Sequence, residues 1–451
     1  MNRKGRFLTL VSLLALVFSI SGCLVVENTY SGLPPGVWRA ALKIELNPIT
    51  TNPKGAPLAD KVNIQFDEVA AGELPFTFEV VYPTPDSFYI EIINAGERII
   101  VDDISIGRDR RTAKDTVVIN FPVFDSYIRG IFVENILEGE WVVRNKVNYR
   151  IPFVAYHGRN HRFTHLKKEP VIDLNGKWEV TFGVDDEHDP YPAIGEFKQD
   201  GNLVTGTFLT ETGDYRFLEG TIQEDRLYLS TFDGSHAFLF EAKVQADGSL
   251  LGSFRSGKHY RTLWSARKNP EAQIRGPNDI TYLKNEDEPF QISFPNREGK
   301  MISLDDERYQ NKVKIVQIFG TWCPNCRDET KFLVDYLKSN PNQEVEVIAV
   351  AFERHLEETK AWGSLDRYKE KFGMEYEILL AAASDSKANA SELLPMLNEI
   401  VSFPTLVFLD RNNRVKRVHT GFNGPATSEY KAFEEDFHKF VQELVNTDQS
   451  L

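Results

Sequence analysis

The sequence is poor in cysteine, with three such residues among 451. Cys323 and Cys326 are separated by two residues, and Cys23 lies near the amino terminus. No cysteine therefore remains for a structural disulfide. A structural zinc site needs four ligands, usually Cys or His, and His355 and His419 stand isolated in the sequence. We accordingly expect neither a metal nor a cofactor, and the Cys-x-x-Cys pair is left for redox chemistry.

Positive charge is also in short supply. The chain carries 52 Lys and Arg against 66 Asp and Glu, which gives a formal net charge of −14. Such an acidic balance argues against nucleic acid or an anionic lipid surface as a partner. We expect no nucleic-acid binding, and any membrane attachment must come from another feature of the chain.

The amino terminus has the layout of an export signal. Basic residues precede an apolar run over 7–20, which is too short to span a membrane as a mature helix. The run ends in Ile20-Ser21-Gly22-Cys23. This ending resembles the lipobox of bacterial lipoproteins, whose cysteine becomes acylated. We predict a signal peptide over 1–22, lipid attachment at Cys23 and a location on the periplasmic side of the cell envelope; an ordinary cleaved signal with a chance cysteine is the alternative.

Amphipathic helices are missing from the first part of the chain. Between residues 36 and 163 the pattern is one of short strands separated by turn signals. We expect a mainly-β domain over 23–168. The clearest predicted strands cover 76–82, 87–93, 98–106, 116–121, 127–133 and 140–144.

A more regular strand pattern follows over 174–268. Eight short runs in sequence suit a closed up-and-down barrel or a tightly curled sheet, because closure removes exposed edges. We predict a second β domain over 169–268 and a linker over 269–288. The expected strands cover 178–182, 193–199, 203–210, 215–222, 226–231, 237–244, 249–255 and 261–267.

The two β regions share short matches in the same order and at a nearly constant offset. Residues 120–127 match 229–236, and 139–141 match 252–254. Gly36-Val37-Trp38 could then correspond to Gly176-Lys177-Trp178. An internal duplication accounts for this order, although short aromatic and glycine matches also arise by chance between strands.

Three histidines precede the second β region at four-residue spacing. On a helix, His157, His161 and His165 would share a face and could hold a metal. Gly158 and the absence of an apolar stripe argue against a helix. We interpret the stretch as a polar connector between domains.

Strands and helices alternate in the last part of the chain, over 289–451. This alternation predicts an α/β domain with a central sheet and helices on both faces. The expected fold class is therefore multidomain, with two mainly-β domains before the α/β domain. We predict strands over 313–319, 345–352, 376–380, 405–409 and 415–420, and helices from Cys323 onward and over 359–372, 391–400 and 433–445.

The cysteine pair lies where an apolar strand meets a helix. Cys323 at the helix start lies at the positive end of the helix dipole, which stabilises a thiolate. Cys326, one turn into the helix, is placed to be buried and to resolve a mixed disulfide. Pro324 suits the first helical turn, where its missing N–H had no partner.

Residues 320–329 (Gly-Thr-Trp-Cys-Pro-Asn-Cys-Arg-Asp-Glu) together with Phe403-Pro404 resemble the TlpA/ResA family of membrane-tethered thiol-disulfide reductases, over about 289–445. The resemblance implies a thioredoxin-like fold, a disulfide-containing protein substrate and a membrane electron donor that reduces the pair again. It also implies that Cys323 attacks and Cys326 releases the product. The expected catalytic residues are Cys323, Cys326, Glu329 and Pro404, and the expected substrate-binding residues are Trp322 and Phe403.

Two other functions compete with a reductase. A thioredoxin-fold peroxidase carries a Pro-x-x-x-Thr/Ser-x-x-Cys pattern, and residues 316–323 lack its proline. The other alternative is a binding or scaffold lipoprotein whose main business is the β domains, with the dithiol as an accessory. No feature of the sequence excludes this second alternative.

Overall fold

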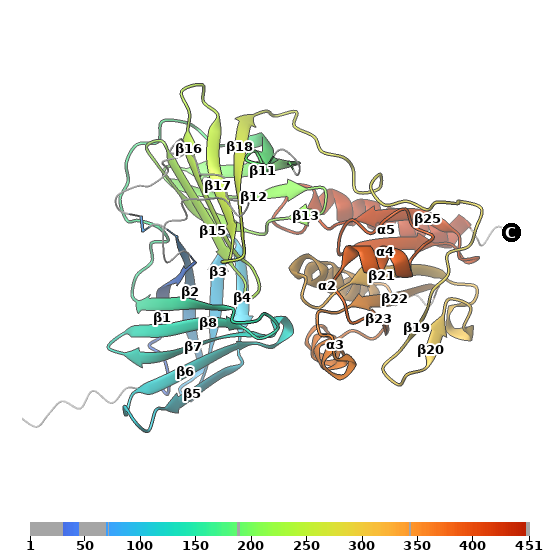
Figure 1. The fold of residues 1–451 in the computed structure, drawn as a ribbon, viewed down its shortest axis with the longest axis horizontal. Helices are drawn as coiled ribbons and strands as arrows, with labels where there is room; N and C mark the ends of the chain where they lie inside the picture. The colour runs from blue at the N-terminus through green and yellow to red at the C-terminus, as the bar shows by residue number, and fades with distance from the viewer. Residues whose placement is uncertain (1–29, 45–68, 71, 187–189, 342–343, 448–451) are drawn as a thin grey trace, which may run out of the picture.

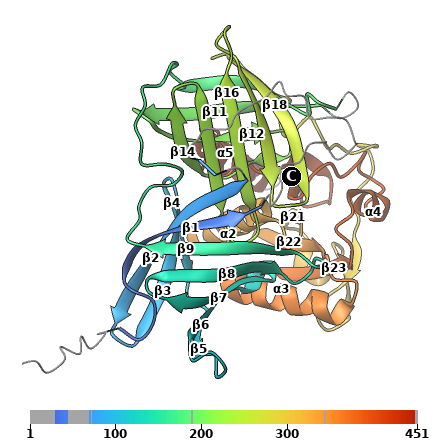
Figure 2. The same cartoon turned by 60° about the vertical axis from the view of Figure 1, so that its left-hand side comes forward.

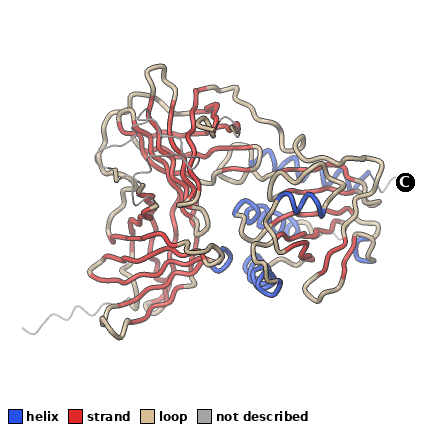
Figure 3. The backbone as a smooth tube through the Cα atoms, viewed as in Figure 1, coloured by secondary structure: helices blue, strands red, loops and turns tan. Residues whose placement is uncertain are grey.

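The computed structural model describes residues 30–44, 69–70, 72–186, 190–341 and 344–447. Two β domains lie one above the other, and an α/β domain packs beside both (Figure 1 and Figure 2). Within the described residues, α-helices are confined to the α/β domain, and the first β domain carries a short 3-10 helix, η1 Pro122–Phe124 (Figure 3). None of these helices is both long and apolar enough to cross a bilayer. The predicted export signal and Cys23 lie outside the described residues.

The first β domain is one antiparallel sheet in the order β4-β3-β2-β1-β9-β8-β7-β6-β5. The sheet curls but stays open between β4 and β5, and we call it the half-barrel domain. Its core contains Trp38, Trp141 and Phe76, all almost fully buried. The strands are β1 Gly36–Lys43, β2 Glu73–Thr84, β3 Ser87–Asn94, β4 Glu97–Val101, β5 Ile104–Arg108, β6 Asp115–Phe121, β7 Ser126–Val133, β8 Ile136–Val143 and β9 Arg150–His157.

Two expectations for this domain are wrong. The predicted strand over 98–106 is two strands at opposite edges of the sheet, because Asp102 and Asp103 interrupt the apolar pattern between β4 and β5. β1 and β9 were not among the clearest predicted strands, and Pro152 in the middle of β9 weakens its strand signal. His157 therefore ends a strand rather than belonging to the connector.

The second β domain is a closed barrel. β11 pairs with both β10 and β12, which closes the order β11-β10-β18-β17-β16-β15-β14-β12. All eight predicted strands are present, but the one expected at 215–222 begins only at Leu218, after the two-residue β13. We call this the barrel domain. Its strands are β10 Gly176–Phe182, β11 Tyr191–Asp200, β12 Leu203–Thr210, β13 Gly213–Asp214, β14 Leu218–Gln223, β15 Arg226–Phe232, β16 Ala237–Val244, β17 Leu250–Ser256 and β18 Tyr260–Lys268.

The two β domains repeat one strand order. β1 lies between β2 and β9 in the first, and β10 lies between β11 and β18 in the second. The indole N–H of Trp38 donates to Pro34 O at 3.0 Å, and that of Trp178 donates to Leu174 O at 2.8 Å. The matched sequence stretches thus occupy equivalent strands, which favours the duplication.

The α/β domain has a five-stranded sheet in the order β23-β22-β21-β24-β25, and we call it the dithiol domain. β21 is buried along its whole length; it runs parallel to β22 and antiparallel to β24. The elements are β19 Ser293–Pro295, β20 Met301–Ser303, β21 Val313–Phe319, α2 Pro324–Ser339, β22 Val345–Phe352, α3 Glu358–Phe372, β23 Glu377–Ala382, α4 Lys387–Leu393, β24 Thr405–Leu409, β25 Val415–Thr420 and α5 Tyr430–Thr447.

The helix predicted over 391–400 is misplaced. α4 begins earlier, where the Ser386 side chain accepts a hydrogen bond from Asn389 N–H, and it ends at Leu393. Pro395 disfavours helical geometry at Leu394, which explains the early end. With this correction, the fold class agrees with the expectation of an α/β domain preceded by two mainly-β domains.

Candidate active site: a dithiol enclosed by three domains

The cysteine pair lies at the junction of β21 and α2. Cys323 is the N-cap of α2, and its Sγ accepts a hydrogen bond from Cys326 N–H at 3.2 Å. The Cys323 thiol donates to Phe403 O at 3.4 Å. Both cysteines are free; Cys323 is 7% exposed and Cys326 is fully buried. Of the two sulfurs, only that of Cys323 is therefore open to a reaction partner.

The loop before β24 lies against Cys323. The Phe403–Pro404 peptide bond is cis. The Phe403 ring packs edge to face on Trp322, with ring centroids 5.6 Å apart. Trp322 is held from behind, because its indole N–H donates to Phe352 O at 2.9 Å and the Arg354 guanidinium lies 4.2 Å from its ring centroid. The structure thus brings Trp322, Phe403 and Pro404 together beside the dithiol.

Glu329 lies in the core beneath the cysteines. Its side chain is fully buried, and Oε2 accepts a hydrogen bond from Gln317 Nε2 at 3.0 Å. Oε1 has no hydrogen-bond partner among the described residues. Burial raises the pKa of Glu329 well above its usual range, with a smaller rise from Cys323, because a charge is poorly solvated there. These conditions favour the protonated acid.

The Cys326 thiol is also poorly solvated. Burial raises the pKa of the Cys326 thiol well above its usual range, and the hydrogen bond and charge of Cys323 and the charge of Glu329 raise it further. Cys326 therefore holds its proton until a reaction step removes it. A neutral Glu329 opposes that removal less than an ionised one.

Sequence reasoning missed a buried polar chain around Glu329. Gln317 in the middle of β21 also donates to Thr330 Oγ1 at 3.0 Å, and Tyr368 donates to the same oxygen at 3.0 Å. Tyr376 donates to Gln317 Oε1 at 3.3 Å. The signal in the sequence is Gln317 within the apolar run from Ile315 to Phe319, because a buried amide needs partners.

A second buried carboxyl, Glu353, was also missed. Its oxygens accept hydrogen bonds from Thr321 N–H and Thr321 Oγ1, both at 2.8 Å. Burial raises the pKa of Glu353 to about 7, although the bonds from Thr321 and the charge of Arg354 oppose the rise. Glu353 thus fixes the turn immediately before Trp322 and Cys323.

The barrel and half-barrel domains close over the dithiol. Above Cys323 lies a cavity of about 480 Å³, which we call the dithiol cavity. Its walls come from all three domains. Because the lining residues are up to hundreds of positions apart in the sequence, no local pattern could predict this cavity. Residues that line it include Lys146 of the half-barrel, Tyr191, Tyr215, Phe238 and His259 of the barrel, and Trp322, Arg354, Lys387 and Phe403 of the dithiol domain.

A buried ion cluster holds the three domains together. Arg216 of the barrel is 2% exposed; it pairs with Glu97 of the half-barrel at 2.6 Å and with Asp328 of α2. Asp233 lies 3.7 Å from its Nε. Breaking a buried pair of this kind costs about 3–5 kcal/mol. The cluster therefore favours a closed arrangement of the domains.

Two hydrogen bonds from side chains of the dithiol domain to the backbone of the barrel reinforce this closure beside the cysteines. Asn325, between the two cysteines, donates to Asp214 O at 3.3 Å. Ser402, before Phe403, donates to Thr212 O at 2.8 Å. The barrel segment that ends in β13 thus covers one side of the dithiol.

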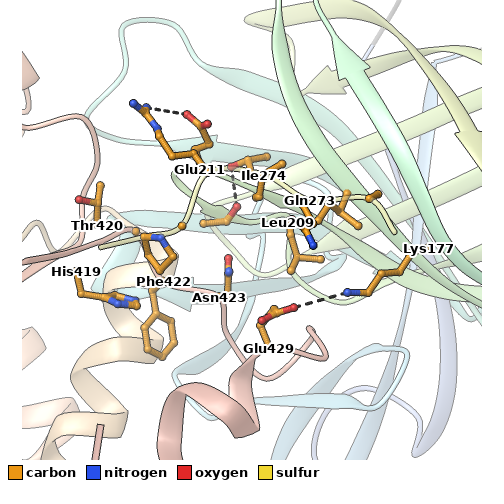
Figure 4. A pocket seen from close by; sticks show the side chains of 18 of the residues that line it. Lys177, Leu209, Glu211, Gln273, Ile274, His419, Thr420, Phe422, Asn423 and Glu429 are labelled. Carbon is orange, nitrogen blue, oxygen red and sulfur yellow. Dashed lines mark hydrogen bonds and ion pairs between the residues drawn. The ribbon is translucent and has the colours of Figure 1, made fainter. Parts of the chain in front are cut away.

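A second cavity of about 380 Å³ is lined by part of that segment, by the linker after the barrel and by residues of the dithiol domain (Figure 4). Two ion pairs cross its rim: Glu211 with Arg275 at 3.0 Å, and Lys177 with Glu429 at 3.7 Å. Neither cysteine lines it. Of these two cavities, only the dithiol cavity is lined by Cys323.

The three histidines at four-residue spacing are apart from both cavities. His157 Nε2 lies 2.9 Å from Pro35 O, and the rings of His161 and His165 stand 5.7 Å apart. Within the part of the chain that the structure describes, no group of three or more His, Cys, Asp or Glu side chains is arranged to hold a metal.

One family model matches the last third of the chain. Residues 284–433 match the Redoxin family model. The thiol-disulfide oxidoreductase ResA of Geobacillus thermodenitrificans (strain NG80-2) is 28% identical over 124 residues, 28% of this chain and 62% of that protein. ResA of Geobacillus kaustophilus (strain HTA426) is 28% identical over 113 residues, 25% of this chain and 57% of that protein. The chain thus spans less than two thirds of either relative.

Among solved structures, a thiol:disulfide interchange protein of the thioredoxin family from Chlorobium tepidum TLS is similar to this chain. It is 21% identical with a TM-score of 0.27, and the match covers 39% of this chain and 99% of that one.

Proposed function

We propose that this chain, whose residues 284–433 form a TlpA/ResA-like Redoxin domain, is a thiol-disulfide oxidoreductase that reduces substrate disulfides through Cys323 and Cys326. One observation carries the proposal. Cys323 caps α2 and faces the dithiol cavity, whereas Cys326 is buried directly behind it. An attacking thiol needs access and a stabilised negative charge, and a resolving thiol needs protection and proximity.

The reaction proceeds in two exchange steps. The Cys323 thiolate attacks one substrate sulfur, the substrate S–S bond breaks, and one substrate thiolate leaves and takes a proton from solvent. The Cys326 thiolate then attacks the Cys323 sulfur of the mixed disulfide and expels the second substrate thiolate. The substrate gains two electrons, and the protein is left with a Cys323–Cys326 disulfide.

Glu329 favours the ionisation of Cys326 by remaining uncharged in the core near it. Burial keeps this carboxyl largely protonated, so it adds little negative charge beside a Cys326 that must ionise. Gln317 fixes its orientation. We assign Glu329 to the second exchange step, in which the Cys326 thiolate forms.

Trp322, Phe403 and Pro404 shape the approach to Cys323. Trp322 and Phe403 line the dithiol cavity with their rings in contact. The Phe403 carbonyl accepts a hydrogen bond from the Cys323 thiol. A substrate that enters the cavity meets these two rings beside the attacking sulfur.

The sequence supports an envelope location for this chemistry. The predicted signal peptide over 1–22 and lipid attachment at Cys23 would hold the three domains on the periplasmic side of a membrane. A membrane electron donor would then return the Cys323–Cys326 disulfide to the dithiol. A protein disulfide is the substrate that the family resemblance implies.

The assignment is tested by replacing Cys323 with serine in the full chain. The reduced protein is mixed with insulin or with bis(2-hydroxyethyl) disulfide, and the loss of thiols from the chain itself is followed. We expect the wild-type chain to lose two thiols per chain rapidly. We expect Cys323→Ser to lose this rapid phase, because serine is not a nucleophile toward disulfides.

Cys23→Ser is the matched control, since it removes the third cysteine and leaves the dithiol intact. It should react like the wild-type chain. Equal rates for Cys323→Ser and the wild-type chain would contradict the assignment.

A further inference from the structure

We infer that the disulfide reduced at Cys323 belongs to a small anionic molecule that binds in the dithiol cavity between the barrel and the dithiol domain. This inference rests on the proposed oxidoreductase function and narrows its substrate class. It differs from the protein disulfide that the family resemblance implies. Three kinds of observation support it: the charges of the cavity wall, the size and lining of the cavity, and the limited access to Cys323.

The wall of the dithiol cavity carries an excess of positive charge. Lys146, Arg354 and Lys387 line it, each from a different stretch of the chain. Asp214 is the carboxylate among the lining residues, and it already accepts hydrogen bonds from Arg216 N–H at 2.7 Å and Gly424 N–H at 2.5 Å. Each of its two carboxyl oxygens thus already accepts a backbone hydrogen bond.

The two lysines lack carboxylate partners within the described residues. Arg354 pairs with Asp385 at 2.6 Å. The ammonium of Lys146 instead lies over the Tyr149 ring, 4.8 Å from its centroid. Lys387 is exposed at the start of α4, close enough to Cys323 for the thiolate charge to act on it. An anionic ligand would supply the missing negative charge.

The titration of neighbouring groups agrees with a positive local field. Burial and the charge of Arg354 lower the pKa of Lys146 to about 8, although the charge of Asp385 opposes this fall. Burial and the charges of Lys146 and Arg354 lower the pKa of His259 to about 4. An anion placed among these side chains would be attracted by the same field.

The cavity has the size and lining of a small-molecule site. Its volume of about 480 Å³ lies within the range of about 300–1,000 Å³ found for such pockets. The barrel supplies aromatic walls from Tyr191, Tyr215 and Phe238, and the Tyr191 and Tyr215 hydroxyls are 2.8 Å apart. Apolar walls with a few polar groups bind the body of a ligand and orient its charge.

Limited access to Cys323 favours a small ligand over a folded protein. Cys323 is only 7% exposed, and Asn325 and Ser402 on either side of it are hydrogen-bonded to the barrel. The Arg216 ion cluster holds this closed arrangement. A small disulfide R–S–S–R fits beneath the barrel, where Cys323 forms Cys323–S–S–R and releases one R–SH. Cys326 then releases the second R–SH, and the protein dithiol is the reductant.

The test compares three small disulfides of different charge on the reduced full chain. Dithiodipropionate carries two carboxylates, bis(2-hydroxyethyl) disulfide is neutral, and cystamine carries two ammonium groups. Each oxidation rate is divided by the rate at which dithiothreitol reduces the same compound, which removes differences in intrinsic reactivity. We expect a corrected rate for dithiodipropionate at least about tenfold above that for cystamine, falling at high salt.

Lys146→Gln locates the preference in the cavity wall. We expect it to lower the ratio of the dithiodipropionate rate to the cystamine rate several-fold. Lys258→Gln is the matched control, because the Lys258 ammonium lies 5.0 Å from the same Tyr149 ring but outside the cavity lining. It should keep the wild-type ratio.

The outcomes separate this inference from the proposed function. A wild-type ratio near one, a ratio unchanged in a folded Lys146→Gln, or a corrected rate on insulin above that on dithiodipropionate would each overturn the anionic small-molecule substrate and leave the oxidoreductase standing. If Lys146→Gln does not fold, the wild-type charge series and its salt dependence decide alone. No oxidation of the dithiol by any of the disulfides would overturn the proposed function itself.

Discussion

At the scale of single residues, the site depends on carboxyl and thiol groups that are kept neutral by burial. Glu329 and Cys326 share the same face of α2 beneath the cavity, and neither is exposed. Glu353 holds the turn before Cys323 from the other side. Each group binds its proton more tightly in the folded chain than in water, so each makes the stability of the reduced protein depend on pH.

Glu329→Gln should flatten that pH dependence. Since burial raises the pKa of Glu329 in the folded chain, its stabilising effect is complete below the usual pKa of an exposed glutamate and is lost as the pH rises toward the folded value. Between about pH 5 and 7 the wild-type unfolding free energy should fall more steeply than that of the variant, by up to about 1.4 kcal/mol per pH unit. Urea titrations of the reduced chains at several pH values measure the two slopes.

Glu370→Gln serves as the control for that comparison, because Glu370 is an exposed glutamate on α3. Its slope should equal that of the wild-type chain. Glu353 and Asp214 titrate in the same window, with pKa values raised to about 7 and about 6, but they are present in all three chains. Equal slopes for Glu329→Gln and wild type would show that this carboxyl is not held protonated.

The sequence predicted the residues of the site that lie in one local stretch. Cys323, Cys326 and Glu329 follow β21 within a few positions, and Phe403-Pro404 was found from the order of the elements. Gln317 and Glu353 were missed, because their importance depends on burial and on partners distant in sequence. The catalytic assignments of the predicted residues remain predictions.

At the scale of elements, the turn between β21 and α2 is shaped by a close approach. Gly320 follows β21, and a methyl group there would lie 2.3 Å from Trp322 Nε1 and 2.7 Å from Phe352 O. The Phe352 carbonyl is the acceptor for the Trp322 indole. A side chain at Gly320 would therefore drive Trp322 away from the wall of the cavity.

Gly320→Ala should destabilise the chain by about 1–3 kcal/mol, the usual cost of inserting a methyl group into a packed site. It should also change the tryptophan emission, since Trp322 loses its hydrogen bond. Gly363→Ala in α3 is the control. The nearest atom to its new methyl group lies 3.6 Å away, so the helix should gain up to about 1 kcal/mol. A neutral Gly320→Ala with unchanged emission would contradict the tight turn.

Strand patterns were more predictive than helix boundaries. The eight strands of the barrel follow a regular alternation with turn residues between them, so all were found. The split at Asp102 and Asp103 and the early start of α4 were missed, because a single pair of aspartates and one capping serine decide them. Local signals as weak as these determine where a strand or helix begins and ends only together with the surrounding folded structure.

At the scale of the whole molecule, the dithiol lies between domains rather than at an open surface. Arg216 brings the barrel, the half-barrel and α2 into one ion cluster, and the dithiol cavity opens at their junction. The sequence predicted the three units but not their arrangement. Lys146 of the half-barrel and Lys387 of the dithiol domain lie together near Cys323 only in the assembled molecule. The β domains, whose purpose was open at the level of sequence, form most of the wall of the site.

The central claim, that Cys323 attacks and Cys326 resolves, is tested most directly by the intact mass of a trapped adduct. Reduced full chains carrying Cys326→Ala in a Cys23→Ser background are exposed to neutral bis(2-hydroxyethyl) disulfide, beside Cys23→Ser alone as control. Without the resolving thiol, the first exchange step should stop at the mixed disulfide. The reaction therefore requires only the cysteine that faces the cavity.

We predict one mercaptoethanol group on Cys323 of the Cys326→Ala chain, removable by dithiothreitol, and in the control no adduct but the loss of two hydrogens as the Cys323–Cys326 disulfide forms. Absence of the adduct in the variant, or a persistent adduct in the control, would contradict the account.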